Sequence, residues 1–172
     1  FGANAFLYAI VVFYPQLLET IGITSSLWIG GYLTVNGVAG GISAALYDRL
    51  KARVEARQLV LVAFTLWTVA FGIAASVASP IALVVPVFLF GLGVGLVFPS
   101  AFGWIEALAP QRLQGQFSSY LAMAGYIGQF VSPLLFGVFV APFGIDGVFL
   151  AAAVMASIGL ATLGAMFISA HP

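Results

Sequence analysis

The chain has 172 residues, of which 63% are hydrophobic and 6% charged, and its formal net charge at pH 7 is zero. A soluble domain carries about 25% charged residues, so this composition excludes a water-facing globular surface and indicates the lipid bilayer as the solvent. The balanced charge provides no basic face for nucleic acid, and the absence of cysteine excludes disulfides and thiolate chemistry. We therefore expect a membrane protein with no nucleic-acid partner.

Six apolar stretches are each long enough for a spanning helix, which needs about 20 residues. Their predicted ranges are 3–20, 27–47, 59–78, 82–106, 116–140 and 147–169, within a single transmembrane domain that covers residues 1–172. The stretches are apolar on all sides, whereas the strands of a membrane barrel alternate between apolar and polar residues. The predicted fold class is therefore an all-α membrane protein with six transmembrane helices.

The first two stretches each carry polar residues at helical spacing. Asn4 and Tyr8 lie four residues apart in the first stretch, as do Tyr32 and Asn36 in the second, so each pair shares one face of a helix. Such a face can serve helix packing alone or line a cavity. Asn36 favours the cavity, because an amide at mid-membrane depth usually faces the bundle interior or water.

Small residues predict close contacts between helices. Gly37 and Gly41 in the second stretch, and Gly91 and Gly95 in the fourth, have the Gly-x-x-x-Gly spacing that lets helix backbones approach each other in lipid. Pro99 follows the second pair and predicts a bend in the fourth stretch. The third stretch carries little polarity, and we interpret it as a helix that faces lipid.

The fifth stretch is the most polar of the six. Tyr126 and Gln129 share a face in it, while Gly128 and Pro133 predict local bending. The one histidine of the chain, His171, follows the sixth stretch. An intramembrane enzyme would need a nucleophile–base pair, a carboxylate pair or a metal cluster at depth, and the sequence offers none. We expect no metal, no cofactor and no enzymatic activity.

Basic residues are confined to two connections between the stretches. Four of the five lie between the second and third stretches, and Arg112 lies between the fourth and fifth. Cytoplasmic loops of membrane proteins are enriched in lysine and arginine. The distribution therefore predicts that these two connections, and with them both termini, are cytoplasmic.

The first of these connections resembles the signature Gly-x-x-x-Asp-Arg-x-Gly-Arg-Arg of the major facilitator superfamily. Asp48, Arg49 and Arg53 match the signature, while Ala44 and Lys51 stand in place of its two glycines. This degenerate form is similar to the copy found in the C-terminal halves of such transporters.

Three further patterns are similar to other helices of such a half. They are residues 15–23 in the first stretch, the glycines of 91–95 with Pro99 in the fourth, and Pro110-x-Arg112-x-x-Gly115 followed by Gly128 and Pro133 in the fifth. The whole chain thus resembles the C-terminal half of a drug- or metabolite-efflux-like major facilitator. Because it starts at Phe1 and not at methionine, we expect it to be one half of a twelve-helix transporter.

The resemblance implies a mechanism and a set of site residues. Two six-helix halves would enclose a central cavity and expose it alternately to the two sides of the membrane. The first, second, fourth and fifth stretches would line this cavity or the interface between the halves. The residues expected to line the cavity are Asn4, Tyr8, Tyr32, Asn36, Tyr126 and Gln129. The residues expected to act in a cytoplasmic gate are Asp48, Arg49, Arg53 and Arg112.

The resemblance also implies partners and a location. We expect a small organic substrate, which is neutral or amphipathic because the cavity candidates carry no charge. The other expected partners are the lipid bilayer and an N-terminal half or a second copy of the chain. No carboxylate lies at mid-membrane depth, so a proton-coupling acid would belong to the other half. The hypothesis is proton-coupled efflux across a bacterial inner membrane.

Two other classes of membrane protein were considered against this hypothesis. A channel would show a filter loop or a charged ring, and neither is present in the sequence. A structural or accessory subunit with the same fold but without transport activity stays open, because fold does not determine function.

Overall fold

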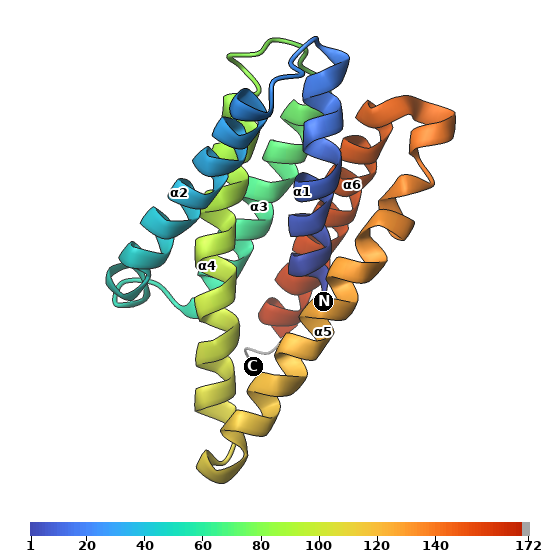
Figure 1. Cartoon of the computed structure of the whole chain (residues 1–172). Helices are drawn as coiled ribbons and strands as arrows, with labels where there is room; N and C mark the ends of the chain where they lie inside the picture. The colour runs from blue at the N-terminus through green and yellow to red at the C-terminus, as the bar shows by residue number, and fades with distance from the viewer. Residues whose placement is uncertain (170–172) are drawn as a thin grey trace.

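The computed structural model describes residues 1–169, so His171 lies outside the described residues. All regular structure in this range is helical (Figure 1). The elements are α1 (Gly2–Thr20), α2 (Ser26–Lys51), α3 (Ala56–Ala74), α4 (Val84–Leu108), the 3₁₀ turn η1 (Gln111–Leu113), α5 (Gln114–Gly137) and α6 (Val140–Ser169).

Four helices of the described chain, α2, α3, α4 and α6, are long and apolar enough to cross a membrane. The remaining two, α1 and α5, are comparable in length and carry Asn4 and Gln16 in one and Gln129 in the other. Six spans therefore stay a prediction. These two helices hold four of the six residues expected to line the cavity.

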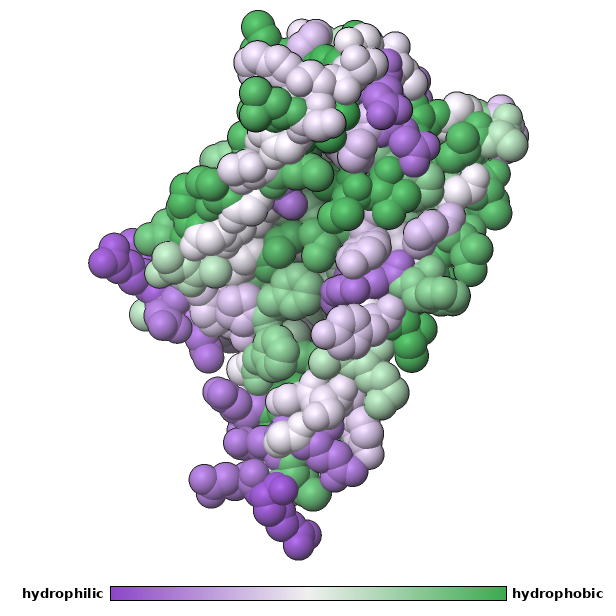
Figure 2. Space-filling model, in the orientation of Figure 1, coloured by the Kyte–Doolittle hydropathy of each residue, from purple (hydrophilic) through white to green (hydrophobic). Residues whose placement is uncertain are grey.

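The helices form two layers. In Figure 1, α1, α2, α4 and α5 lie toward the viewer, with α3 and α6 behind them. The connections α1–α2, α3–α4 and α5–α6 gather at one end of the bundle, and α2–α3 and α4–α5 at the other. The two connections that hold the basic residues thus lie at the same end. Figure 2 shows this end as hydrophilic against a largely apolar surface.

The ends of α2 and α3 are set by charged residues. Arg49 and Lys51 lie in the last turn of α2, where positive charge stabilises the exposed carbonyl groups, so α2 continues past the predicted end at 47. Glu55 begins α3 earlier than predicted, because its side chain and that of Gln58 form a capping box. The charged stretch is therefore mostly helical, and the connection is reduced to residues 52–55.

The α5–α6 connection is shorter than the interval 141–146 that separates the predicted fifth and sixth stretches. Helix α6 begins at Val140 and contains a break at Gly144, whose φ of 69° and ψ of −172° are not helical. A positive φ of this kind is accessible to glycine without steric cost. The chain therefore turns at this one residue inside the apolar segment.

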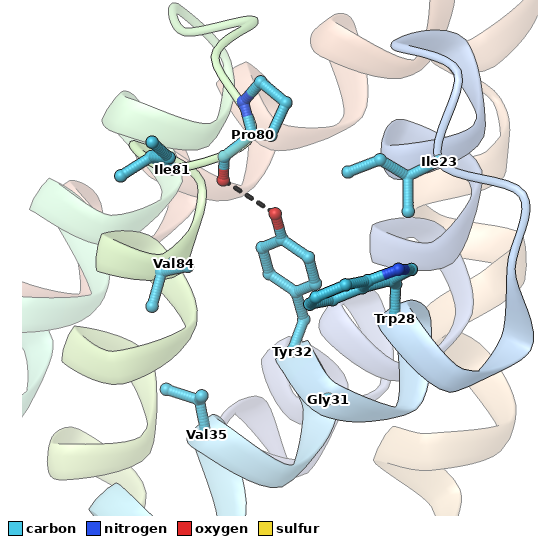
Figure 3. Close-up of a pocket in the computed structure, with 8 residues that line it drawn as sticks. All are labelled: Ile23, Trp28, Gly31, Tyr32, Val35, Pro80, Ile81 and Val84. Carbon is cyan, nitrogen blue, oxygen red and sulfur yellow. Dashed lines mark hydrogen bonds between the residues drawn. The ribbon is translucent and has the colours of Figure 1, made fainter.

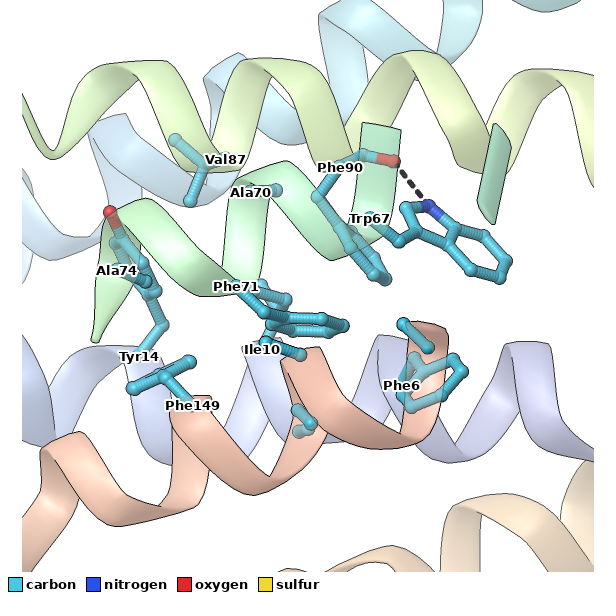
Figure 4. Close-up of a cluster of buried hydrophobic side chains, with 14 of the residues drawn as sticks. Phe6, Ile10, Tyr14, Trp67, Ala70, Phe71, Ala74, Val87, Phe90 and Phe149 are labelled. Carbon is cyan, nitrogen blue, oxygen red and sulfur yellow. Dashed lines mark hydrogen bonds between the residues drawn. The ribbon is translucent and has the colours of Figure 1, made fainter. Parts of the chain in front are cut away.

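The core is aromatic and centres on α3. The Trp67 ring stacks on Phe90 of α4 with centroids 5.3 Å apart, and its Nε1 donates a hydrogen bond to the Phe90 carbonyl at 3.0 Å (Figure 4). Phe71 of α3 packs against both Phe90 and Phe6 of α1. The interpretation of the third stretch as a lipid-facing helix is wrong for this side of α3, because Trp67 and Phe71 are fully buried. Only its opposite side, with Val62, is exposed.

Glycines bring α2 and α4 into close contact. A Cβ atom added at Gly91 would overlap the carbonyl oxygen of Asn36, and one added at Gly95 would overlap that of Gly40. Ser43 lies in the same contact, and its Oγ donates to the Leu92 carbonyl at 2.8 Å. The predicted packing role of Gly91 and Gly95 is thus seen in the α2–α4 contact.

Gly37 and Gly41 do not take part in this contact. Both are exposed, and a Cβ atom at either would meet nothing within 4 Å in the described chain. The helical rotation places Gly40 toward α4 and turns Gly37 and Gly41 away from it. Their predicted role in packing is therefore wrong within this bundle.

We predict that Gly95→Ala destabilises the protein. The added methyl group would push α2 and α4 apart against backbone atoms, at a cost of about 1–3 kcal/mol. The melting temperature of the purified full-length protein in detergent would fall accordingly. Gly37→Ala is the matched control, because its methyl group enters open space. Equal melting temperatures for the two variants would contradict this account of the contact.

Candidate functional site

The site is built where α5 packs along α1. Ser132 is fully buried in this contact, and its Oγ donates to the Ala5 carbonyl at 2.7 Å. A Cβ atom at Gly128 would overlap the carbonyl oxygen of Phe1. Close approach at Gly128 and the hydroxyl bond of Ser132 therefore fix the rotation of α5 relative to α1. That rotation decides which α5 side chains face the first helix.

An amide pair joins the two helices beside this contact. Gln129 Nε2 donates to Asn4 Oδ1 at 2.9 Å, across 125 positions of the sequence. Gly125 makes room for the pair, because a Cβ atom there would lie 2.9 Å from Asn4 Nδ2. The structure thus brings together two of the residues predicted to line a cavity. Gly125 was not among the predicted site residues. Its position four residues before Gln129 places it on the same helix face, and this spacing could have indicated a close contact beside Gln129.

Two hollows meet at this pair. An open groove of about 550 Å³ is lined by Tyr8, Val12, Tyr126, Gln129, Phe130, Pro133 and Leu134. A deeper cavity of about 400 Å³ reaches from α1 and α5 to α3, α4 and α6. Asn4 lines the cavity, Tyr8 lines the groove, and Tyr126 and Gln129 line both. Figure 2 shows polar residues crossing the centre of this face over α1 and α5.

Both hollows are free of ionisable acidic and basic side chains. Their polar groups are the two amides and the hydroxyls of Tyr8 and Tyr126, and the rest of the lining is apolar or aromatic. Volumes of this size are typical of small-molecule sites. The arrangement can offer hydrogen bonds and aromatic surface to a ligand, but no charge to balance an ionic one.

Tyr32 lies away from these residues, at the end of the bundle where α3 connects to α4. Its hydroxyl donates to the Pro80 carbonyl at 2.7 Å, beside Trp28 and Ile81 in an apolar pocket of about 560 Å³ (Figure 3). Tyr14 of α1 donates to the carbonyl of Leu83 nearby. The two tyrosines therefore hold the α3–α4 connection. The structure does not bring Tyr32 together with Asn4, Tyr126 and Gln129, because its hydroxyl bonds to the α3–α4 connection.

Asn36 lies on the side of α2 that meets α4. Its backbone carbonyl faces Gly91, and its Oδ1 is buried without a hydrogen-bond partner among residues 1–169. An unpaired buried acceptor costs about 1–3 kcal/mol. Asn36 therefore carries an unused acceptor, but none of the hollows described here is lined by it.

The predicted gating residues are exposed at the basic end of the bundle. Asp48, Arg49, Arg53 and Arg112 form no ion pair within residues 1–169, where the salt bridge that forms is Arg57 Nε to Glu55 Oε2 at 2.5 Å. Their role in a cytoplasmic gate stays a prediction.

The two predicted bends do not interrupt their helices. Helix α4 continues through Pro99, and α5 continues through Pro133. Because proline has no N–H group, Pro133 leaves the backbone carbonyl of Gln129 without its usual helical donor. An additional acceptor thus lies next to the amide pair.

No group of three or more histidine, cysteine or acidic side chains that could hold a metal ion occurs in the described residues.

The family model described as Major Facilitator Superfamily matches residues 1–172, the whole chain. No curated protein matches the chain.

We predict that Asn4 and Gln129 are energetically coupled. A double-mutant cycle with Asn4→Ala and Gln129→Ala should give a coupling free energy of about 0.5–1.5 kcal/mol in thermal unfolding, because each single change already removes their hydrogen bond. Gln16→Ala is the control, since Gln16 Nε2 bonds only to the Val12 carbonyl of its own helix. Strict additivity of Asn4→Ala with Gln129→Ala would show that the pair contributes nothing.

Proposed function

The chain belongs to the major facilitator superfamily, and from that premise we propose that it performs secondary active transport of a small organic molecule by alternating access. Members of this family are membrane transporters, so the chain is an integral membrane protein of a transport family. The observation that carries the more specific proposal is the uncharged site at α1 and α5, where an amide pair stands between an open groove and a deeper cavity.

The composition of this site supports a neutral or amphipathic substrate. A buried ionic group needs a partner of opposite charge, because the hydrocarbon core cannot solvate it. The lining supplies hydroxyl, amide and aromatic groups and no carboxylate, guanidinium or ammonium. An uncharged organic molecule can satisfy these groups without leaving a charge unpaired.

A second body is needed to enclose the site. The groove is open on the side of the molecule formed by α1 and α5, and Gly37 and Gly41 leave one side of α2 without neighbours in this chain. Alternating access requires two such bodies that rock about a central site. We propose that the second body is an N-terminal six-helix half or a second copy of this chain.

Proton-coupled efflux is the proposed energy source and direction. The carboxylates of the described helices lie toward helix ends: Glu19 is next to the end of α1, Asp48 is in the final turns of α2, Glu106 is near the end of α4, and Asp146 is in the first turns of α6. None lies at the level of the amide pair, so the proton-carrying acid belongs to the second body in this proposal. The basic end of the bundle would face the cytoplasm of a bacterial cell, with the protein in its inner membrane.

We predict that Asp48→Asn slows transport several-fold without lowering expression. Asp48 is exposed and unpaired in residues 1–169, so its charge is available to a group of the second body in one of the two states. The measurement is efflux of the uncharged dye Nile red from cells that express the full-length protein. Glu19→Gln, at the opposite end of the bundle, is the control. Wild-type efflux by Asp48→Asn would reduce this acid to part of a topological signal.

We also predict that Gln129→Ala lowers Nile red efflux or its apparent affinity about tenfold, because one hydrogen bond to the transported molecule is lost. Gln16→Ala, which changes an exposed amide of α1, should transport normally. Unchanged kinetics in Gln129→Ala would overturn the cavity assignment. Absence of any transport by the wild-type protein would favour the structural or accessory subunit.

A further inference from the structure

The amide pair uses only part of its hydrogen-bonding capacity. A single bond joins Gln129 Nε2 to Asn4 Oδ1, and no other described residue bonds to Asn4 Nδ2 or Gln129 Oε1. The buried side-chain atoms without a partner in residues 1–169 are Asn36 Oδ1 and Thr68 Oγ1, so both free atoms of the pair are open to a ligand. The pair therefore keeps one free donor and one free acceptor, on two residues that both line the deeper cavity.

The presence of one free donor and one free acceptor does not depend on how the oxygen and nitrogen atoms of the two amides are assigned. Each amide carries one acceptor oxygen and one NH₂ donor. If both were turned over, Asn4 Nδ2 would donate to Gln129 Oε1, and the free groups would be Gln129 Nε2 and Asn4 Oδ1. One donor and one acceptor would still remain free.

The surrounding backbone holds the pair in place. Gly125 lies against Asn4 Nδ2, and the Ser132 bond to the Ala5 carbonyl joins the two helices one residue after Asn4 and three residues after Gln129. The Gln129 carbonyl, freed by Pro133, adds an acceptor at the same level of α5. The donor–acceptor edge is thus a fixed feature of the α1–α5 contact.

Aromatic rings flank this edge on both sides. Tyr8, Tyr126 and Phe130 line the open groove, and Phe98, Phe102 and Trp104 line the deeper cavity. Tyr126 is 68% exposed, so its ring is available for contact with a ligand. Flat rings pack well against such faces.

We propose that the amide pair recognises a planar, uncharged ring compound that carries a lactam or imide edge. The ring carbonyl accepts from Asn4 Nδ2, and the adjacent ring N–H donates to Gln129 Oε1. The ring itself lies among the aromatic side chains of the deeper cavity, which both amides line. This inference rests on the proposed transport function and names the substrate class of the same site.

The test compares two probes that differ by one donor. Binding of 2-quinolone and of N-methyl-2-quinolone to the purified full-length protein is measured by equilibrium dialysis. N-methylation removes the N–H group and leaves Gln129 Oε1 without a partner, so we expect it to weaken binding about tenfold. Equal affinities for the two probes, or no binding of either, would overturn the proposal. This comparison needs no variant and does not depend on the folding of one.

The variant Gln129→Met tests whether the preference for 2-quinolone over N-methyl-2-quinolone comes from the amide pair. Gln129→Met keeps the length of the side chain but removes its hydrogen-bonding groups, so the preference for 2-quinolone should fall below about twofold. Gln16→Met, which changes an exposed amide on the same helix pair, should keep the wild-type preference. Retention of a tenfold preference in Gln129→Met would also overturn the proposal.

Nile red efflux tests the transport function separately. Efflux together with equal binding of the two quinolones would overturn only the substrate class. Discriminating binding that is lost in Gln129→Met, without any efflux, would support the lactam site and overturn the transport proposal. When both the transport proposal and the lactam-site proposal hold, 2-quinolone should inhibit Nile red efflux at a concentration about tenfold lower than its N-methyl derivative.

Discussion

The close approach of helix backbones is the constraint on which this structure depends. In a bilayer, lipid tails are as apolar as the side chains, so helices associate through tight packing and interhelical hydrogen bonds. Gly91 and Gly95 allow this approach between α4 and α2, and Gly125 and Gly128 allow it between α5 and α1. Each contact fixes a helix rotation. The polar site is a consequence of the rotation of α5.

Most interhelical hydrogen bonds of the described bundle run from a side chain to a backbone carbonyl, and the exceptions are Tyr47 to Ser100 and Gln129 to Asn4. Ser43, Trp67 and Ser132 each donate from a side chain to a backbone carbonyl of another helix. These bonds use up their donors and stabilise the packing. The Asn4–Gln129 bond instead joins two amides, and both keep unused hydrogen-bonding groups. The hydroxyl and indole bonds therefore serve helix packing, whereas the Asn4–Gln129 pair can also bind a ligand.

Much of the site could be predicted from residue types, but the pairing could not. Asn4, Tyr8, Tyr126 and Gln129 were predicted because polar residues in apolar helices usually face an interior. Tyr32 satisfied the same rule, yet its hydroxyl bonds to Pro80 at the end of the bundle. Gly37 and Gly41 had the expected spacing, yet Gly40 faces α4. Spacing shows which residues share a face, but not which neighbour that face meets.

The sequence by itself determined the membrane class, the number of long helices and the confinement of basic residues to two connections, because these follow from composition and segment length alone. Only the tertiary structure decided that α3 is buried around Trp67, and that Asn4 bonds to Gln129 from the far end of the chain. A helix that is apolar on all sides has no hydrophobic face to reveal its inward side. Its rotation is set by contacts with other helices, which are distant in sequence.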